Sequence, residues 1–407
     1  MMGMHRRNFI TAGLTSLAFP SVAFAKNLTH IELVGAQCFD GTKFVRRDLR
    51  VINGRFTTES FKGGAVERVD LTGRWIVPAF ADAHSHSFGE GQPSVERARA
   101  SKYVQDGVLY VMSQGNLPLS PADQRAMGVN VPDGPDVAFA NGMVIAADGP
   151  VRGFYEAIVF PSGAFPGRSF ESLADSRYFE VSDVASLDAK WPLIRAQKSD
   201  FVKVYLHNSE RDASIRFAPF FKGSGVSPAV LQDLVRKAHA EGLRVSAHVA
   251  SAGDIIAALD AKVDMLAHVP DGPITAEVAA RVAEARIPIV TTMAFRARAM
   301  PPPGEAVLEN NLRLLREASA NLVIGADIPS DSSVGEMAYL AATKLWSNAE
   351  LLRMWSVTTP QAIYPGRRLD LSEGAEGSCL VLAQDPLANW DATRAIDRRM
   401  KKGVWLA

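Results

Sequence analysis

The stretch VPAFADAHSHSF, from Val77 to Phe88, decides the fold. An apolar run typical of a buried strand ends in two histidines one residue apart, His84 and His86, with Asp82 just before them. Residues i and i+2 of a strand point to the same side, so both imidazoles can face one metal ion. An H-x-H pair alone is common by chance, and the surrounding sequence has to decide.

Strand and helix patterns alternate on the C-terminal side of this stretch. Helical candidates such as SPAVLQDLVRKAHAEG combine a Ser-Pro start, a 3.6-residue apolar period and a glycine stop. Eight apolar strands with helices between them predict an α/β fold, a (β/α)₈ TIM barrel; a doubly wound open sheet is the alternative. The strand candidates are RWIVPAFADAHSH, GVLYVMSQG, DVAFANGMVI, FVKVYLH, RVSAHVA, MLAHVP, IPIVTTMA and NLVIGADIP.

Unusual polar residues stand in or at the ends of these strands. Lys203 lies inside FVKVYL, and RVSAHV, DMLAHV and LVIGAD end in His248, His268 and Asp327. A lone histidine is more often a hydrogen-bonded core residue, and a lone aspartate more often a turn former. The ends of parallel barrel strands, however, converge on one face. A buried lysine without a partner is also costly. Together these residues predict a metal site.

The chain resembles the amidohydrolase superfamily of binuclear metal-dependent hydrolases. The similarity lies in PAFADAHSH, FVKVY, AEGLRVSAHV, DAKVDMLAHV and GAD, and more loosely in WSVTTPQAIY and EGAEGSCLVLAQDPL. The closest subgroup is imidazolonepropionase-like and prolidase-like. The resemblance implies a barrel with a small β-sandwich domain formed by the N- and C-terminal segments. Alternating strand patterns at both ends of the chain agree with this.

The resemblance also implies a role for each site residue. His84, His86 and Asp327 would hold the more buried of two divalent ions, and His248 and His268 the second. A carboxylated Lys203 would bridge them. Nitrogen and oxygen ligands suit zinc best. A metal-bridging hydroxide would attack the substrate carbonyl, with Asp327 as acid and base and Tyr205, on the strand face of Lys203, as donor to the oxyanion.

The substrate is less well defined. His207 shares the parity of Tyr205 and is a candidate pocket residue, with a solvent-facing loop position as the alternative; for Tyr205 the alternative is a core position at the barrel rim. Carboxylate capture would fall to Arg152, Arg296 or Arg298. The family's strand 8 GTDAG is GADIP here, and the TGGHG stretch after strand 3 is ADGPVRGF, without its histidine. These departures affect the pocket and leave the substrate open.

Residues 1–25 form a separate segment. A basic start, an apolar middle and Ala23-Phe24-Ala25 predict a signal peptide. Arg6 and Arg7 before Phe9 and Ile10 indicate the twin-arginine type; an ordinary secretory signal or a short membrane anchor is the alternative. We expect a periplasmic protein, with 26–78 as the N-terminal part of the β-sandwich, 79–365 as the hydrolase barrel and 366–407 as the C-terminal part.

Composition excludes other classes. The 407-residue chain has 44 Lys plus Arg and 44 Asp plus Glu, so nothing favours nucleic acid. No segment after the signal is long and apolar enough to span a membrane. Export would permit a disulfide between Cys38 and Cys379, with two buried thiols as the alternative.

The sequence thus predicts an exported amidohydrolase that cleaves amide bonds of small peptides or N-acyl amino acids. It would act on a small-molecule substrate, and assembly into a homo-oligomer is compatible with the sequence. A lactonase or esterase on the same metals, and a non-catalytic binding protein, are the alternatives. A mononuclear deaminase is disfavoured, because it would not need Lys203.

Overall fold

The computed structural model describes residues 30–61, 65–211, 219–299, 304–329 and 331–407. The expected signal peptide, 1–25, lies outside these residues. Among the described residues, no helix is both long and apolar enough to cross a membrane.

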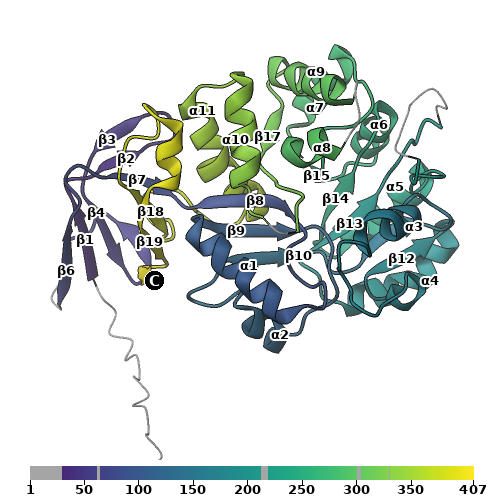
Figure 1. Cartoon of the computed structure of the whole chain (residues 1–407), viewed down its shortest axis with the longest axis horizontal. Helices are drawn as coiled ribbons and strands as arrows, with labels where there is room; N and C mark the ends of the chain where they lie inside the picture. Colours follow the sequence, from purple (N-terminus) through teal and green to yellow (C-terminus); the bar gives the residue numbers. More distant parts are fainter. Residues whose placement is uncertain (1–29, 62–64, 212–218, 300–303, 330) are drawn as a thin grey trace, which may run out of the picture.

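Strands from both ends of the chain lie together at one end of the molecule (Figure 1). One sheet has the order β5-β4-β1-β6 and a second the order β20-β19-β18-β7-β2-β3. Apolar residues from both sheets share one cluster that includes Ile31, Val51, Ile76 and Val381. The strands are β1 His30–Val34, β2 Gln37–Phe39, β3 Phe44–Arg46, β4 Leu49–Ile52, β5 Arg55–Thr57, β6 Val66–Asp70, β7 Trp75–Pro78, β18 Cys379–Leu382, β19 Ile396–Lys401 and β20 Val404–Leu406.

The middle of the chain forms two further sheets. Their orders are β10-β9-β8 and β12-β11-β13-β14-β15-β16-β17, and every pairing within them is parallel. The strands are β8 Phe80–Ser85, β9 Val108–Ser113, β10 Asp136–Phe139, β11 Met143–Ala146, β12 Tyr178–Val181, β13 Phe201–Tyr205, β14 Arg244–His248, β15 Met265–Leu266, β16 Pro288–Val290 and β17 Asn321–Val323.

Backbone hydrogen bonds join these two sheets on two sides. The Ala83 N–H in β8 donates to the carbonyl of Ile324, just after β17, at 2.7 Å, and the Asp327 N–H donates to the His84 carbonyl at 2.7 Å. On the other side, the Asp200 N–H donates to the carbonyl of Phe139, the last residue of β10, at 2.9 Å. β8 therefore meets the chain that follows β17, which brings the first and last strands of the middle region together.

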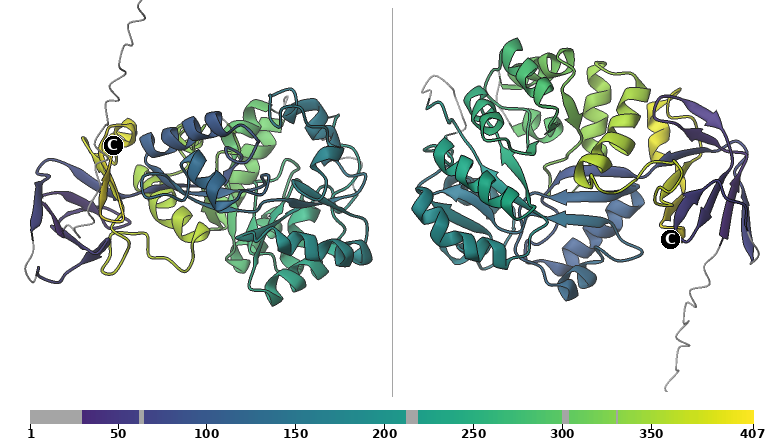
Figure 2. Two further views of the ribbon diagram at one scale, coloured as in Figure 1. Left: turned by 90° about the horizontal axis from the view of Figure 1, so that it is seen from below. Right: turned by 180° about the vertical axis from the view of Figure 1, so that it is seen from behind.

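Helices cover the outside of these strands, and Figure 2 shows this arrangement from below and from behind. α4 packs on α5, α5 on α6, α6 on α7, and α7 on α9. The helices are α1 Pro93–Gln105, α2 Pro121–Met127, α3 Val151–Phe154, α4 Val184–Ala196, α5 Pro228–Ala240, α6 Ala252–Asp260, α7 Ala276–Ala285, α8 Met293–Ala299, α9 Gly304–Glu317, α10 Val334–Thr343, α11 Asn348–Arg353 and α12 Thr359–Ile363.

Local sequence explains where the predicted helices begin. The Ser227 side chain accepts a hydrogen bond from the Val230 N–H, with Pro228 at the first helical position of α5. Ser251 and Asp254 form a reciprocal capping box at the start of α6. Each helix therefore begins close to its predicted start.

Three strand predictions need correction. The expected single strand DVAFANGMVI is interrupted at residues 140–142, and its two parts, β10 and β11, belong to different sheets. The expected single strand RWIVPAFADAHSH is two strands, because β7 pairs with β18 while β8, after Ala79, pairs with β9. β12 was not expected at all. It lies parallel to β11, with Tyr178, Phe179 and Val181 buried in its four residues. The apolar pattern predicted strand conformation but not the partner strand.

Candidate metal centre

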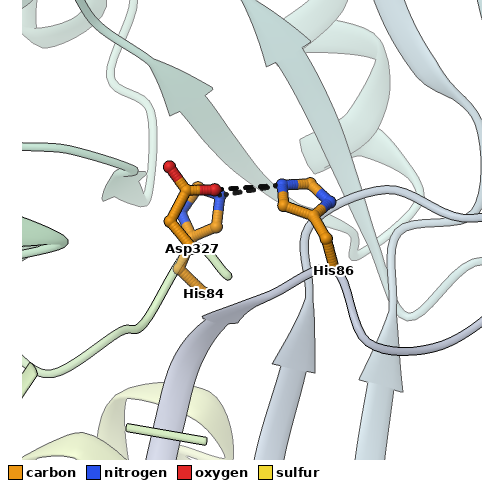
Figure 3. A group of neighbouring side chains, drawn as sticks. All are labelled: His84, His86 and Asp327. Atoms are coloured by element: carbon orange, nitrogen blue, oxygen red, sulfur yellow. Dashed lines mark hydrogen bonds and ion pairs between the residues drawn. The ribbon is translucent and has the colours of Figure 1, made fainter. Parts of the chain in front are cut away.

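His84, His86 and Asp327 bring three ligand atoms together (Figure 3). Nε2 of His84 lies 3.3 Å from Nε2 of His86. Oδ1 of Asp327 lies 3.3 Å from each of these nitrogens. His84 is buried, whereas the His86 side chain is 26% exposed and lies on the solvent side of the site.

This triangle has the dimensions of a metal site. Ligands held about 2.0–2.1 Å from a tetrahedral zinc ion lie about 3.3–3.4 Å from one another. The three observed separations are all 3.3 Å. A hydrogen-bonded cluster would place donor and acceptor about 2.7–3.2 Å apart. The spacing therefore fits one divalent cation better than a direct hydrogen-bond network.

The backbone around Asp327 is built for this approach. Asp327 has a φ of 57°, a left-handed conformation that aspartate tolerates better than most residues. A Cβ atom on Gly325 would lie 2.6 Å from Cβ of His84 and 2.4 Å from Cγ1 of Val290. Only glycine lets the end of this strand lie so close to β8.

His268, His248 and Lys203 lie beside this triangle. The centroid of the His268 ring lies 4.5 Å from that of the His84 ring, which is tilted against it, and 4.5 Å from that of the His248 ring, which it meets edge to face. Nδ1 of His268 lies 3.7 Å from Oδ2 of Asp327. Lys203 is buried on β13, and its Nζ has no hydrogen-bond partner among the described residues. An orphaned buried amine next to a cluster of imidazoles fits a residue whose partner is a ligand.

Burial sets the protonation of the site. It holds the pKa of His84, His248 and His268 well below the ordinary histidine value. Burial is also the main reason why the pKa of Lys203 is lowered to about 7. It raises the pKa of Asp327, but the His84 and His86 rings outweigh it and hold that pKa at about 2. Neutral imidazoles and an ionised carboxylate are the forms that bind metals.

Asp82 supports the site from below, a role that its place in the motif did not reveal. Its carboxylate accepts hydrogen bonds from the N–H groups of His84 and Ala326, both at 3.1 Å. The Tyr103 hydroxyl, from α1, donates to it at 3.1 Å. Burial raises the pKa of Asp82 to about 7. The carboxylate thus ties β8 to the strand end that carries Asp327.

Thr292 and Glu336 position His268, and no sequence pattern pointed to either residue. The Thr292 hydroxyl lies 2.9 Å from Nδ1 of His268. Thr292 has a φ of 49°, which is strained for a β-branched residue. The Glu336 carboxylate holds this turn by accepting from the N–H groups of Met293 and Ala294 at 2.9 and 2.7 Å.

The other predicted site residues fall into two groups. Tyr205 and His207 are buried near the imidazoles, and the Tyr205 ring stacks 3.9 Å from the His248 ring. Burial raises the pKa of Tyr205 and lowers that of His207 to about 4. The arginines predicted to bind a carboxylate form the second group, and their surroundings differ from one another.

Two of these arginines already have acidic partners. Arg296 is buried and paired with Asp271. Its positive charge helps to lower the pKa of His248 and His268, after burial, so it lies near the centre. Arg152 lies on α3 with 48% of its side chain exposed, paired with Glu171 at 2.6 Å. The side chain of Arg298 lies outside the described residues.

Comparison with solved structures agrees with this architecture. A prolidase in complex with N-methylphosphonate-L-proline matches with a TM-score of 0.72 and 15% identity, over 93% of this chain and 99% of that one. An ochratoxinase from A. niger matches with a TM-score of 0.74 and 15% identity, covering 93% and 95%. Molinate hydrolase matches with a TM-score of 0.73 and 18% identity, also covering 93% and 95%.

The predicted resemblance is confirmed at the level of the fold. The chain has the mixed α/β fold of amidohydrolases and prolidases along nearly its whole length. Neither a family sequence model nor a curated protein matches the sequence. At identities of 14–18%, fold is what the likeness carries, and the activity has to be argued from the site.

Proposed function

We propose that this chain is a metal-dependent hydrolase that cleaves amide bonds of small peptides or N-acyl amino acids. The observation that carries the proposal is the triangle of ligand atoms from His84, His86 and Asp327, each pair 3.3 Å apart. The fold is shared with a prolidase, an ochratoxinase and a molinate hydrolase, and this supports hydrolytic chemistry at the same end of the strands.

The proposed centre holds two divalent cations, with zinc best suited to the ligands. His84, His86 and Asp327 would hold the first ion, and His248 and His268 the second. Lys203 would join them as a carbamate, formed when its neutral amine adds to carbon dioxide and loses a proton. The orphaned Nζ of Lys203 supports this assignment. When bound, such a pair of ions lowers the pKa of water and polarises a carbonyl.

Two side chains of the chain itself would transfer the proton and stabilise the carbonyl oxygen. Asp327 is ionised, and its Oδ2 is available to take a proton from the attacking water and return it to the leaving amine. The pKa of Tyr205 is raised by burial, so its hydroxyl keeps the proton that it donates to the developing oxyanion.

The finer architecture belongs to the same proposal. The two parallel sheets would close into a (β/α)₈ barrel within 79–365, which is supported by the hydrogen bonds of Ala83 and Asp327 across the seam. Segments 26–78 and 366–407 would form a β-sandwich, which is supported by the cluster shared between the two terminal sheets. Residues 1–25 would direct export to the periplasm by the twin-arginine route.

A paired measurement tests the function. The purified, zinc-loaded chain is assayed against dipeptides, N-acyl amino acids and lactones, before and after metal removal by a chelator. We expect amide hydrolysis that disappears with the metal and returns with zinc. His268→Asn should abolish it. The matched control is His239→Asn. The His239 side chain lies on α5, is 40% exposed and pairs with Asp264. Hydrolysis confined to lactones, or unaffected by the chelator, would contradict the proposal.

A further inference from the structure

Arg177 is a buried cation without an anion. It directly precedes β12 and is 5% exposed. Among the described residues, no carboxylate lies within ion-pair distance of its guanidinium, and its Nε and Nη1 atoms have no hydrogen-bond partner. An unpaired charge in the protein interior is strongly unfavourable unless a partner compensates it. The missing partner is therefore the feature that needs an explanation.

Aromatic rings and a glycine surround the guanidinium. Its carbon lies 5.7 Å from the centre of the Tyr155 ring and 5.6 Å from that of Phe165. A Cβ atom on Gly115, after β9, would lie 2.7 Å from Nη1. Cation–π contacts of this kind recover less than the loss of hydration of a guanidinium. The rings hold Arg177 in place but do not replace an anion.

A second orphaned group lies beside it. The Tyr155 hydroxyl is buried and has no hydrogen-bond partner among the described residues. Burial raises the pKa of Tyr155, the charge of Arg177 opposes this, and the charge of Glu90 adds a smaller increase. The Glu90 carboxylate is already paired with Arg99 at 2.6 Å. Two donors, a guanidinium and a phenol, thus lie together without an acceptor.

These donors lie beside the candidate metal centre. Tyr155 and Tyr205 belong to one cluster of buried residues, and Tyr205 stacks on His248. The positive charge of Arg177 also contributes to the low pKa of Lys203, after the larger effect of burial. The backbone fixes this position, because the Met143 N–H of β11 donates to the Arg177 carbonyl at 3.1 Å.

Two other candidate arginines differ from Arg177 because each already has an acidic partner. Arg152 and Arg296 both have acidic partners, Glu171 and Asp271. Binding a substrate carboxylate there would first require breaking an existing ion pair. Arg177 has no such pair to break, and a planar guanidinium matches a carboxylate with two parallel hydrogen bonds.

We propose that Arg177, with the Tyr155 hydroxyl beside it, binds a carboxylate of the substrate and selects amides that carry one next to the scissile bond. This inference rests on the proposed amide hydrolysis and names the residue that determines its substrate class. N-acyl amino acids and dipeptides, rather than their uncharged amides, would be the substrates. The apolar rings of Tyr155 and Phe165 would favour apolar or aromatic side chains next to that carboxylate.

Matched acids and amides test the assignment. The probes are the N-acetyl derivatives of glycine, leucine, phenylalanine and proline, each as the free acid and as the C-terminal amide. Deacetylation is measured with zinc-loaded protein, and binding is measured by calorimetry with metal-depleted protein. The variants are Arg177→Met, Arg177→Lys and, as a control, Arg281→Met, because the Arg281 side chain on α7 is 45% exposed and pairs with Asp260 at 2.7 Å. Metal per chain and thermal unfolding are recorded for each.

For the wild type we expect a preference for acids over amides in both assays. Arg177→Met should lower kcat/KM on the acids by about 10²- to 10³-fold, with little change on the amides. Arg177→Lys should recover part of the loss, and Arg281→Met should behave like the wild type. Metal content should stay unchanged. Loss of metal in Arg177→Met would instead assign the guanidinium to the centre itself and overturn the inference.

The two proposals fail separately. If the protein cleaves the N-acetyl bond but acts equally on the free acids and the C-terminal amides, or if it binds neither form, the proposed role of Arg177 is wrong. The proposed hydrolysis of amide bonds then still stands. If it hydrolyses none of the probes yet binds the acids through Arg177, the anion site stands and the proposed function fails. A preference for acids that survives in Arg177→Met also overturns the inference.

Discussion

Gly325→Ala tests whether the close approach of two strand ends builds the centre. A Cβ atom there would lie 2.4 Å from Cγ1 of Val290, 2.6 Å from Cβ of His84 and 2.8 Å from its backbone nitrogen. Non-bonded carbons need about 3.5–4.0 Å, so one of the strands has to move by about 1 Å. Overpacking of this kind costs about 1–3 kcal/mol in the free energy of unfolding.

The metal should be more sensitive than the fold. Metal sites tolerate shifts of only about 0.2 Å in ligand distances, so displacing His84 should weaken zinc binding by well over ~10-fold. Denaturant unfolding measures the stability, and competition with a chromogenic chelator measures zinc affinity. Gly335→Ala is the control. Its Cβ would meet nothing closer than Oδ2 of Asp331 at 3.8 Å, and alanine within α10 should stabilise by up to about 1 kcal/mol. Wild-type stability and zinc affinity in Gly325→Ala would refute this reasoning.

Three further predictions use the same protein. Asp327→Asn should keep part of the metal but lower turnover by about 10²-fold or more, because the proton carrier is lost; near-normal turnover with full metal would refute that role. Although burial raises the pKa of Asp136, Lys401 at 2.6 Å and its neighbours hold it at about 2, below the ordinary aspartate value of 3.8. The resulting stabilisation is present above about pH 4 and is lost as the pH falls toward 2. Asp136→Asn should therefore lower the free energy of unfolding by about 2 kcal/mol at pH 7 and by much less near pH 2. An equal loss at both pH values would contradict this role of Asp136. Cys38 and Cys379 are both free and buried, so denatured, unreduced protein should give two reactive thiols, and none would indicate a disulfide instead.

Local pattern was enough to predict that His84, His86 and Asp327 lie together. The i and i+2 parity of His84 and His86 requires only strand conformation, and their nitrogens lie 3.3 Å apart as that parity suggests. Asp327 follows a strand end that parallel topology brings to the same face. These inferences depend on backbone geometry within one element and on one rule about parallel strands.

Features that depend on contacts between distant segments were not predictable in the same way. The break at Ala79 arises because β7 and β8 pair with different strands. The Asp82 carboxylate accepts a hydrogen bond from Tyr103 of α1, and no spacing in the sequence predicts that contact. No pattern in the sequence distinguishes Arg177 from an ordinary surface arginine. Only its tertiary surroundings reveal that it is buried without an acid.

Metal per chain in Lys203→Ala, measured by elemental analysis beside turnover, tests the central claim most directly. The account predicts that metal falls well below the wild-type value of about two per chain and that turnover collapses, because the bridging anion is lost. Added acetate or propionate should restore part of both by filling the gap. A Lys203→Ala chain that keeps two metals and normal turnover would contradict the bridge and the binuclear centre with it.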